Sequence, residues 1–271
     1  MKKAAFIGVG NMGGALARAA CRAVGPDQVV VANRTPDKAE ALAAELGCAV
    51  AKSSAEAVRE AEYIFLGVKP QGMRPLLGTL APVLADCREG RVLVSMAAGL
   101  RIDDMRPCLK EAGSDVPIVR IMPNTCVAIG KGMTAICTDE WWDESVLEEV
   151  EKILSATGKV ERISESLMDQ FAAVAGCGPA FVYPYIEALA DGGVMAGLPR
   201  KQAMEYAAQM VMGAAAMVLE SGKHPGQLKD EVCSPGGSTI AGVAELERGG
   251  LRAAAINAVL ASCRRGVELG K

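Results

Sequence analysis

Aromatic residues are scarce in this sequence, where phenylalanine, tyrosine and tryptophan together make up 4% of 271 residues. Because 51% of the residues are hydrophobic, the cores must be built mainly from Ala, Val, Leu, Ile and Met. The chain is long enough for one large or two modest domains. It contains a single histidine, His224, which we interpret as a helix-boundary residue and not as a catalytic base.

An excess of positive charge and a metal-binding cysteine motif are also missing. The formal net charge is -3 and no Lys/Arg-rich block occurs, which argues against a nucleic-acid partner. Nine cysteines are scattered without a C-x-x-C pair, as expected for reduced thiols in a cytosolic protein without a metal site. The acidic segment 139–144 is interpreted as the start of a helix, where carboxylates suit the helix dipole.

No hydrophobic run is long enough for a signal peptide or a membrane span. The apolar run after the first lysines is broken by Gly8 and Gly10, so no signal-peptide core remains. Residues 207–219 include Gln209 and are too few to cross a bilayer. We therefore expect a soluble, cytoplasmic protein that does not bind membranes.

The most informative stretch is residues 4–14, where an apolar run leads into a G-x-G-x-x-G loop followed by an Ala-rich helical pattern. In this context Gly8 allows a tight turn, Gly10 lets the backbone approach a pyrophosphate, and Gly13 lets the helix lie close to the strand. The helix start at Asn11 and Met12 offers backbone N–H groups to phosphates. The stretch predicts a dinucleotide site, and a surface turn is the alternative.

The residues after the second predicted strand, 28–32, bear on the choice of cofactor. An NAD-binding protein places an acidic residue here, about twenty residues past the glycines, against the ribose 2′-hydroxyl. This chain instead has Asn33, which cannot repel a 2′-phosphate, Arg34, which can pair with one, and Thr35, which adds a hydroxyl. We expect NADP(H) as the preferred cofactor and NAD(H) as a second option; the alternative is a polar turn without a ligand.

Strands and helices alternate along residues 1–163, which predicts right-handed crossovers and a Rossmann-type, doubly wound parallel sheet. Ligands bind such sheets beyond the carboxyl ends of the strands. The predicted strands 63–68, 91–96 and 117–122 should therefore bring three turns into one crevice. The cofactor-binding residues expected in these turns are Val68, Lys69, Pro70, Ala97, Ala98 and Gly99.

From residue 164 to residue 271 the pattern becomes almost entirely helical, with a predicted break at 176–179. The helix expected over 201–220 is apolar nearly all round and has to be covered on every face. We expect an all-helical domain that forms a homodimer; a central helix inside a monomer is the alternative. The segment Gly236-Gly237-Ser238-Thr239 opens another helix, and its N–H groups and hydroxyls predict a cradle for a carboxylate.

Taken together, these features resemble the pyrroline-5-carboxylate reductase family over essentially the whole chain. The resemblance rests on the glycine loop and on several further motifs. They are Val68-Lys69-Pro70-Gln71, Met96-Ala97-Ala98-Gly99-Leu100, Arg120-Ile121-Met122-Pro123-Asn124-Thr125, Gly176-Cys177-Gly178-Pro179-Ala180-Phe181, His224-Pro225-Gly226-Gln227-Leu228-Lys229-Asp230 and, most specific, Ser234-Pro235-Gly236-Gly237-Ser238-Thr239.

The resemblance implies a hydride transfer from NAD(P)H to the C=N carbon of L-1-pyrroline-5-carboxylate, giving L-proline in the last step of proline biosynthesis. It implies that backbone N–H groups around Gly237 and Ser238 hold the substrate carboxylate and that Thr239, the expected catalytic residue, bonds the ring nitrogen. It also implies a helical domain that interlocks with a partner, and dimers that assemble further, commonly into decamers. Cys126, Cys177 and Phe181 depart from the commoner family residues.

Three other functions compete with this interpretation. A 3-hydroxyacid dehydrogenase needs a lysine acid/base in the first helices of its second domain, and no lysine lies between Leu167 and Gly197. A reductase of a related cyclic imine carboxylate would use the same carboxylate cradle. A non-catalytic, NADP-binding regulatory paralogue would keep the scaffold, although the intact segment 234–239 speaks against it.

Overall fold

The computed structural model describes residues 1–87, 90–139 and 144–269, so the predicted helix start at 140–143 lies outside the described residues. The chain divides into two compact units. The first unit contains Met1–Cys177 and Ser262–Lys271, and the second contains Gly178–Ala261. The domain boundary expected after residue 163 stays a prediction.

The first unit is built on a sheet whose strand order, over the described residues, is β3-β2-β1-β4-β5-β6-β7-β8. The strands are β1 (Lys2–Ile7), β2 (Val29–Ala32), β3 (Ala49–Val50), β4 (Ala61–Leu66), β5 (Val92–Ser95), β6 (Ile118–Met122), β7 (Gly132–Thr138) and β8 (Gly158–Arg162). The helices are α1 (Asn11–Val24), α2 (Pro36–Leu46), α3 (Ser54–Glu60), α4 (Pro70–Asp86), α5 (Ile102–Lys110) and α6 (Glu144–Leu154). The predicted doubly wound, Rossmann-type sheet is confirmed, and its order reverses between β1 and β4.

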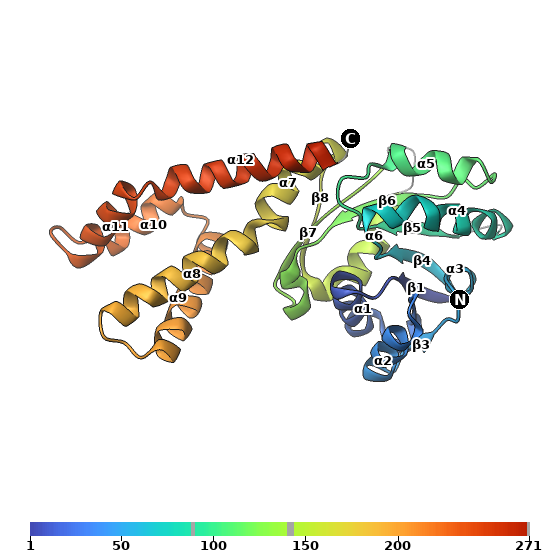
Figure 1. Cartoon of the computed structure of the whole chain (residues 1–271), viewed down its shortest axis with the longest axis horizontal. Coiled ribbons are helices and arrows are strands. Elements are labelled where there is room, and N and C mark those ends of the chain that lie inside the picture. The colour runs from blue at the N-terminus through green and yellow to red at the C-terminus, as the bar shows by residue number, and fades with distance from the viewer. Residues whose placement is uncertain (88–89, 140–143, 270–271) are drawn as a thin grey trace. The chain divides into compact units, whose positions relative to one another are not determined.

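Helices cover both faces of this sheet (Figure 1). Successive strand residues point to opposite faces, so each strand contributes to two cores. On one face Phe6 stacks on Phe65 with ring centroids 4.5 Å apart, and Leu16 of α1 belongs to the same buried cluster. On the other face Ile64 packs in a cluster with Leu77 of α4. Burial on both faces explains why these strands are continuous apolar runs.

Two strands, β7 and β8, run opposite to the other strands and so depart from the parallel arrangement that the alternation predicted. β7 pairs antiparallel with β6, whereas β7 and β8 are parallel to each other. Residues 123–131 connect β6 to β7 through a short 3-10 helix, Thr125–Ile129. A parallel crossover needs about a dozen residues or more, so this connection can only turn the chain back. The length of the connection was a signal in the sequence for the reversed strand.

The second unit is helical, as the pattern after residue 164 predicted. Its helices are α8 (Gly178–Met195), α9 (Arg200–Ser221), α10 (Pro225–Val232), α11 (Ser238–Arg248) and α12 (Leu251–Leu269), the last of which ends in the first unit. The helical elements are interrupted within the break predicted at 176–179, at Cys177, because the preceding helix ends at Gly176 and α8 begins at Gly178. A π-helix over Ala172–Gly176 follows α7 (Met168–Phe171), and the Cys177 N–H donates to the Ala172 carbonyl at 2.8 Å. The interruption is therefore a widened turn and not a long loop, and α8 follows it after one residue.

The second unit buries little of its own apolar surface. Within Gly178–Ala261 the buried hydrophobic residues are Ala190, Ala203 and Ala207. Large side chains stay exposed, including Met195 at 89% and Leu219 at 82%. Apolar surface on this scale marks an interaction surface in a stable protein. The all-round apolar character predicted for residues 201–220 is thus found on α9, where this unit leaves much of it uncovered.

Two features are absent from the described residues. None of their helices combines the length and the apolar character that crossing a membrane requires. They contain no group of three or more His, Cys, Asp or Glu side chains placed to hold a metal ion.

Candidate functional site

The loop between β1 and α1 packs so closely against its surroundings that no side chain fits at Gly13 or at Gly67. Gly8 has φ +92°, a conformation that favours glycine. A Cβ atom on Gly13 would lie 2.1 Å from the Gly8 carbonyl oxygen, and one on Gly67 would lie 2.2 Å from the same oxygen. Side chains there would push α1 and the end of β4 away from β1. This agrees with the packing role predicted for Gly13, and it adds Gly67 to the same contact.

Gly10 differs from these glycines because it faces open space. A Cβ atom placed there would meet no atom of the described residues within 4 Å. The Gly14 N–H donates to the Gly10 carbonyl at 2.8 Å, so the N–H groups of Asn11, Met12 and Gly13 precede the first helical hydrogen bond. In the described structure the first turn of α1 has no acidic residue and no side-chain cap. The residues present therefore fit a phosphate group at this helix start.

Asn33 holds the glycine loop against the turn that follows β2. Its Oδ1 accepts from the Val9 N–H at 3.2 Å, and its Nδ2 donates to the Thr35 carbonyl at 3.0 Å. The amide therefore fixes the loop, a structural role that the sequence pattern did not reveal. Arg34 and Thr35 are exposed beside it, and in the described structure the Arg34 side chain forms no ion pair. Arg34 is therefore available to an anionic ligand.

The turns predicted to line one crevice follow the carboxyl ends of neighbouring parallel strands. β1 lies between β2 and β4, and β4, β5 and β6 continue the parallel order. A Cβ atom on Gly8 would contact Val68 Cγ1 at 3.2 Å, which places the turn after β4 against the glycine loop. Lys69 is exposed at the start of α4, and Ala98 is exposed in the turn after β5, where the Ser95 hydroxyl accepts from the Ala97 N–H at 3.3 Å. The predicted cofactor residues thus gather at one edge of the sheet.

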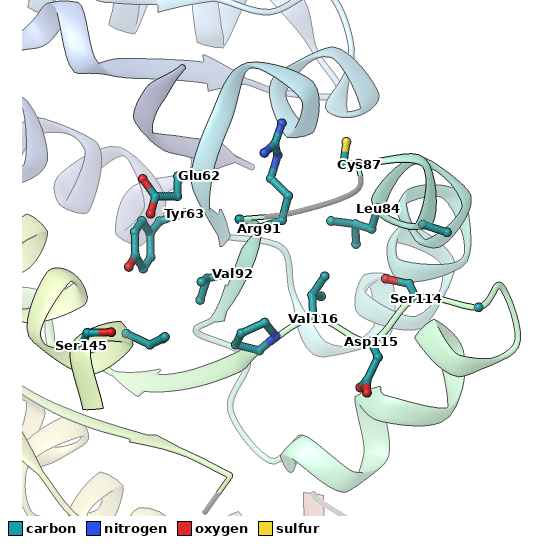
Figure 2. Close-up of a pocket in the computed structure, with 15 residues that line it drawn as sticks. Glu62, Tyr63, Leu84, Cys87, Arg91, Val92, Ser114, Asp115, Val116 and Ser145 are labelled. Carbon is teal, nitrogen blue, oxygen red and sulfur yellow. The ribbon is translucent and has the colours of Figure 1, made fainter. Parts of the chain in front are cut away.

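A cavity of about 460 Å³ lies at the opposite edge of the sheet. Figure 2 shows Tyr63 and Val92 at the amino ends of β4 and β5, with Ser114 and Asp115 from the segment that precedes β6. Ligands of doubly wound sheets bind at the carboxyl ends of the strands, where the glycine loop lies. This cavity is therefore separate from the candidate cofactor site.

The predicted carboxylate cradle lies in the second unit, at the start of α11. Gly236 has φ +67°, and Gly237 precedes the helix and donates its N–H to the Ser234 carbonyl at 3.0 Å. No side chain of the described residues caps this helix start. Ser238 and Thr239 are exposed in its first turn. The N–H groups of this turn are therefore open to an anion.

Arg120 is a buried charge on β6, only 2% exposed. Its guanidinium donates to Glu165 Oε1 at 3.2 Å and lies 3.8 Å from Asp169 Oδ1. Burial raises the pKa of the neighbouring Cys137 thiol to about 12, so this thiol remains protonated at neutral pH. Sequence reasoning missed this network, although an arginine within the apolar strand Ile118–Met122 is a signal for a buried ion pair.

Comparison with known proteins gives the family. A family model described as pyrroline-5-carboxylate reductase dimerisation matches residues 165–269, and one described as NADP oxidoreductase, coenzyme F420-dependent, matches residues 3–99. The pyrroline-5-carboxylate reductase of Escherichia coli (strain K12) is 40% identical over 272 residues, which cover 100% of this chain and 99% of that protein. The chain belongs to the pyrroline-5-carboxylate reductase family.

Solved members of the pyrroline-5-carboxylate reductase family have the same architecture. The Coxiella burnetii reductase matches with a TM-score of 0.90 and 30% identity, covering 100% of this chain and 99% of that one. The Plasmodium falciparum pyrroline carboxylate reductase, solved with NADP bound, matches with a TM-score of 0.87 and 30% identity over 100% and 98% of the two chains. The Rossmann-type sheet with a helical dimerisation domain is thus the fold of the family.

Proposed function

We propose that this chain reduces L-1-pyrroline-5-carboxylate to L-proline with NADPH. The observation that carries the proposal is the 40% identity to the Escherichia coli reductase over the whole length of both chains. The open helix start at Gly10 and the open helix start at Ser238 supply what the two ligands need, a phosphate site and a carboxylate site. Both sites are built from backbone N–H groups. They therefore bind the phosphate and the carboxylate through hydrogen bonds that do not depend on the protonation of a side chain.

The cofactor is held at the carboxyl edge of the sheet. The N–H groups of Asn11 and Met12 bind the pyrophosphate, and Arg34 with Thr35 binds the 2′-phosphate of the adenosine half. The turns after β4 and β5 then face the nicotinamide half, which supplies the hydride when it is bound. The remaining cofactor residues proposed for these turns are Val68, Lys69, Pro70, Ala97, Ala98 and Gly99. The NADP bound to the Plasmodium falciparum relative supports this choice of cofactor.

The substrate is held at the start of α11. Backbone N–H groups around Gly236, Gly237 and Ser238 bind the carboxylate, and the Thr239 hydroxyl bonds the ring nitrogen. One hydride is added to the C=N carbon and one proton is carried on the nitrogen, so the products are proline and the oxidised cofactor. A protonated imine is already electrophilic, so orientation of the two rings supplies most of the acceleration. No histidine base is needed.

The helical unit forms a homodimer. Its exposed apolar residues and the family model for dimerisation over residues 165–269 support this assembly. Further association of dimers, for example into a decamer, is a separate proposal that sedimentation of the purified protein tests. All nine cysteines lie in the described residues and are unpaired, which suits a reducing compartment such as the cytoplasm.

The decisive experiment follows NADPH oxidation at 340 nm with L-1-pyrroline-5-carboxylate and identifies the product as L-proline. Turnover is expected with this substrate, and the six-membered cyclic imine carboxylate is tested beside it. Faster turnover of the larger ring would assign a related reductase. Binding of NADPH without turnover of either imine would assign a non-catalytic paralogue.

Replacing Arg34 by alanine is expected to weaken NADPH binding about 10- to 100-fold, because a charge-assisted bond to the 2′-phosphate contributes about 1.5–3 kcal/mol. NADH has no such phosphate, so its affinity should change by less than about twofold. Cofactor fluorescence titration measures both constants. Arg22→Ala, which removes an exposed charge from the last turn of α1, is the control for non-specific attraction. Equal losses for both cofactors would contradict the 2′-phosphate assignment.

A further inference from the structure

Side chains on β6 and just after it form hydrogen bonds to the segment through which the chain leaves the first unit. This linker segment (residues 165–177) contains a 3-10 turn, α7, the π-helix and Cys177, and it continues directly into α8. Two side chains from the β6 region reach it, Arg120 at its start and Asn124 near its end. Both belong to unit one together with the linker segment, so these contacts lie within one compact body.

Asn124 uses both ends of its amide. Its Oδ1 accepts from the Cys126 N–H at 3.2 Å and from the Met133 N–H at 3.4 Å, which shapes the turn between β6 and β7. Its Nδ2 donates to the Ala175 carbonyl at 3.0 Å. The residue is 8% exposed, so the bonds are shielded from water. One buried side chain thus joins the turn after β6 to the linker segment.

The contact falls on the π-helix. In this helix the Cys177 N–H bonds back to the Ala172 carbonyl at 2.8 Å, five residues earlier, instead of completing an ordinary turn. A widened turn of this kind leaves carbonyl groups that need other partners, and such turns occur frequently at functional sites. Asn124 is the partner of the Ala175 carbonyl. The amide therefore stabilises the irregular turn that directs the chain into α8.

The rest of the linker segment is held in the same way. Glu165 Oε1 accepts from Arg120 at 3.2 Å and also from the Ile102 N–H at 2.9 Å, at the start of α5. The turn that precedes α5 carries the proposed nicotinamide residues Ala97 and Gly99. The linker segment is thus bonded to the turns after two of the strands that form the proposed cofactor edge.

We propose that Asn124 is a positioning residue for hydride transfer, in that its amide locks the π-helix of the linker segment to the carboxyl end of β6 and so holds the turn after β6 in place at the proposed cofactor edge. The inference rests on the proposed function, because this edge of the sheet is where the nicotinamide half of the cofactor is proposed to bind. A misplacement of about 1 Å between reacting groups costs up to about 100-fold in rate. Asn124 itself is not required to touch either ligand.

The test is Asn124→Asp, which keeps the acceptor that bonds Cys126 and Met133 but places an oxygen against the Ala175 carbonyl. We expect kcat to fall at least about tenfold while the NADPH dissociation constant changes less than about threefold. With NADPH deuterated at the transferred position, the isotope effect on kcat should rise, since hydride transfer becomes slower than product release. Activity should recover as the pH falls, because a protonated carboxyl regains the donor.

The matched control is Thr138→Val, which removes a side-chain bond to the Ile118 carbonyl at the other end of the same pair of strands (2.9 Å). It should leave the isotope effect and the pH profile of the wild type unchanged. If Asn124→Asp does not fold, Asn124→Ser replaces it as an uncharged side chain too short to reach Ala175. The proposal would be overturned if either Asn124 variant had the same kcat and the same isotope effect on kcat as Thr138→Val.

A second readout does not depend on activity. Amide hydrogen exchange over residues 172–178 should be at least about tenfold faster in the Asn124 variant than in the wild type and in Thr138→Val. Unchanged protection there overturns the positioning role. If the wild type does not turn over L-1-pyrroline-5-carboxylate, the proposed function fails, and the exchange experiment still decides whether Asn124 locks the π-helix.

Discussion

Gly13→Ala is expected to destabilise the protein by at least about 3 kcal/mol and to abolish NADPH binding. The added methyl group would lie 2.1 Å from the Gly8 carbonyl oxygen, and the obstacle is backbone that cannot rotate away. α1 must therefore shift, and the N–H groups at its start move with it. Urea denaturation and cofactor fluorescence titration measure the two effects. A variant with the wild-type midpoint and affinity would show that α1 does not depend on this close approach.

Gly10→Ala is the matched control, because the same methyl group is added three residues earlier in open space. Gly10 has φ -70° and ψ -162°, an extended conformation that alanine adopts without strain. Its stability should therefore equal that of the wild type within about 0.5–1 kcal/mol. NADPH affinity should still fall at least about tenfold, since the methyl group enters the space proposed for the pyrophosphate. Comparison of Gly13→Ala with Gly10→Ala therefore distinguishes the effect of loop packing on stability from the effect of a steric clash on NADPH binding.

The sequence revealed those parts of the fold that depend on local pattern. Apolar runs of four to six residues followed by helical segments predicted the sheet. Gly47 and Ser53 show how local this information is: Gly47 ends α2 with φ +70°, and the Ser53 hydroxyl accepts from the Glu56 N–H at 3.1 Å at the start of α3. Each of these signals acts over a single helical turn, which is why such features follow from the residues alone.

The parts that the sequence did not reveal depend on contacts between distant residues. Asn33 stays a predicted cofactor residue, but the sequence did not reveal that its amide bonds to Val9 and Thr35, a pairing that forms only when β1 and β2 lie side by side. The partners of Arg120 lie in the linker segment, 45 residues further along the chain for Glu165. The glycines at 176–179 indicated a break, but residue type alone does not reveal that a π-helix supported by Asn124 precedes it.

Thr239→Ala is expected to lower kcat/KM for L-1-pyrroline-5-carboxylate about 5- to 150-fold, or about 1–3 kcal/mol. The loss arises because the ring nitrogen of the bound imine is left without its hydrogen-bond partner. In the described structure the Thr239 hydroxyl makes no hydrogen bond, and Gly237, not Thr239, occupies the capping position of α11. The substitution should therefore change the free energy of unfolding by less than about 0.5 kcal/mol. Steady-state kinetics with both substrates varied, together with urea denaturation, measure these quantities.

Ser238→Ala is the control, since it removes a hydroxyl from the neighbouring exposed position in the same helical turn. Its carboxylate contact is proposed through the backbone N–H, which alanine retains, so kcat/KM should fall less than about threefold. Thr239→Ser keeps the hydroxyl and should recover most of the activity. If kcat/KM were lost in Ser238→Ala and unchanged in Thr239→Ala, the hydrogen bond to the ring nitrogen would be assigned to Ser238 instead. Because the cofactor is proposed to bind the other unit, the KM for NADPH should stay the same in all three variants, and a parallel rise in that constant would mean that the start of α11 also contacts the nucleotide.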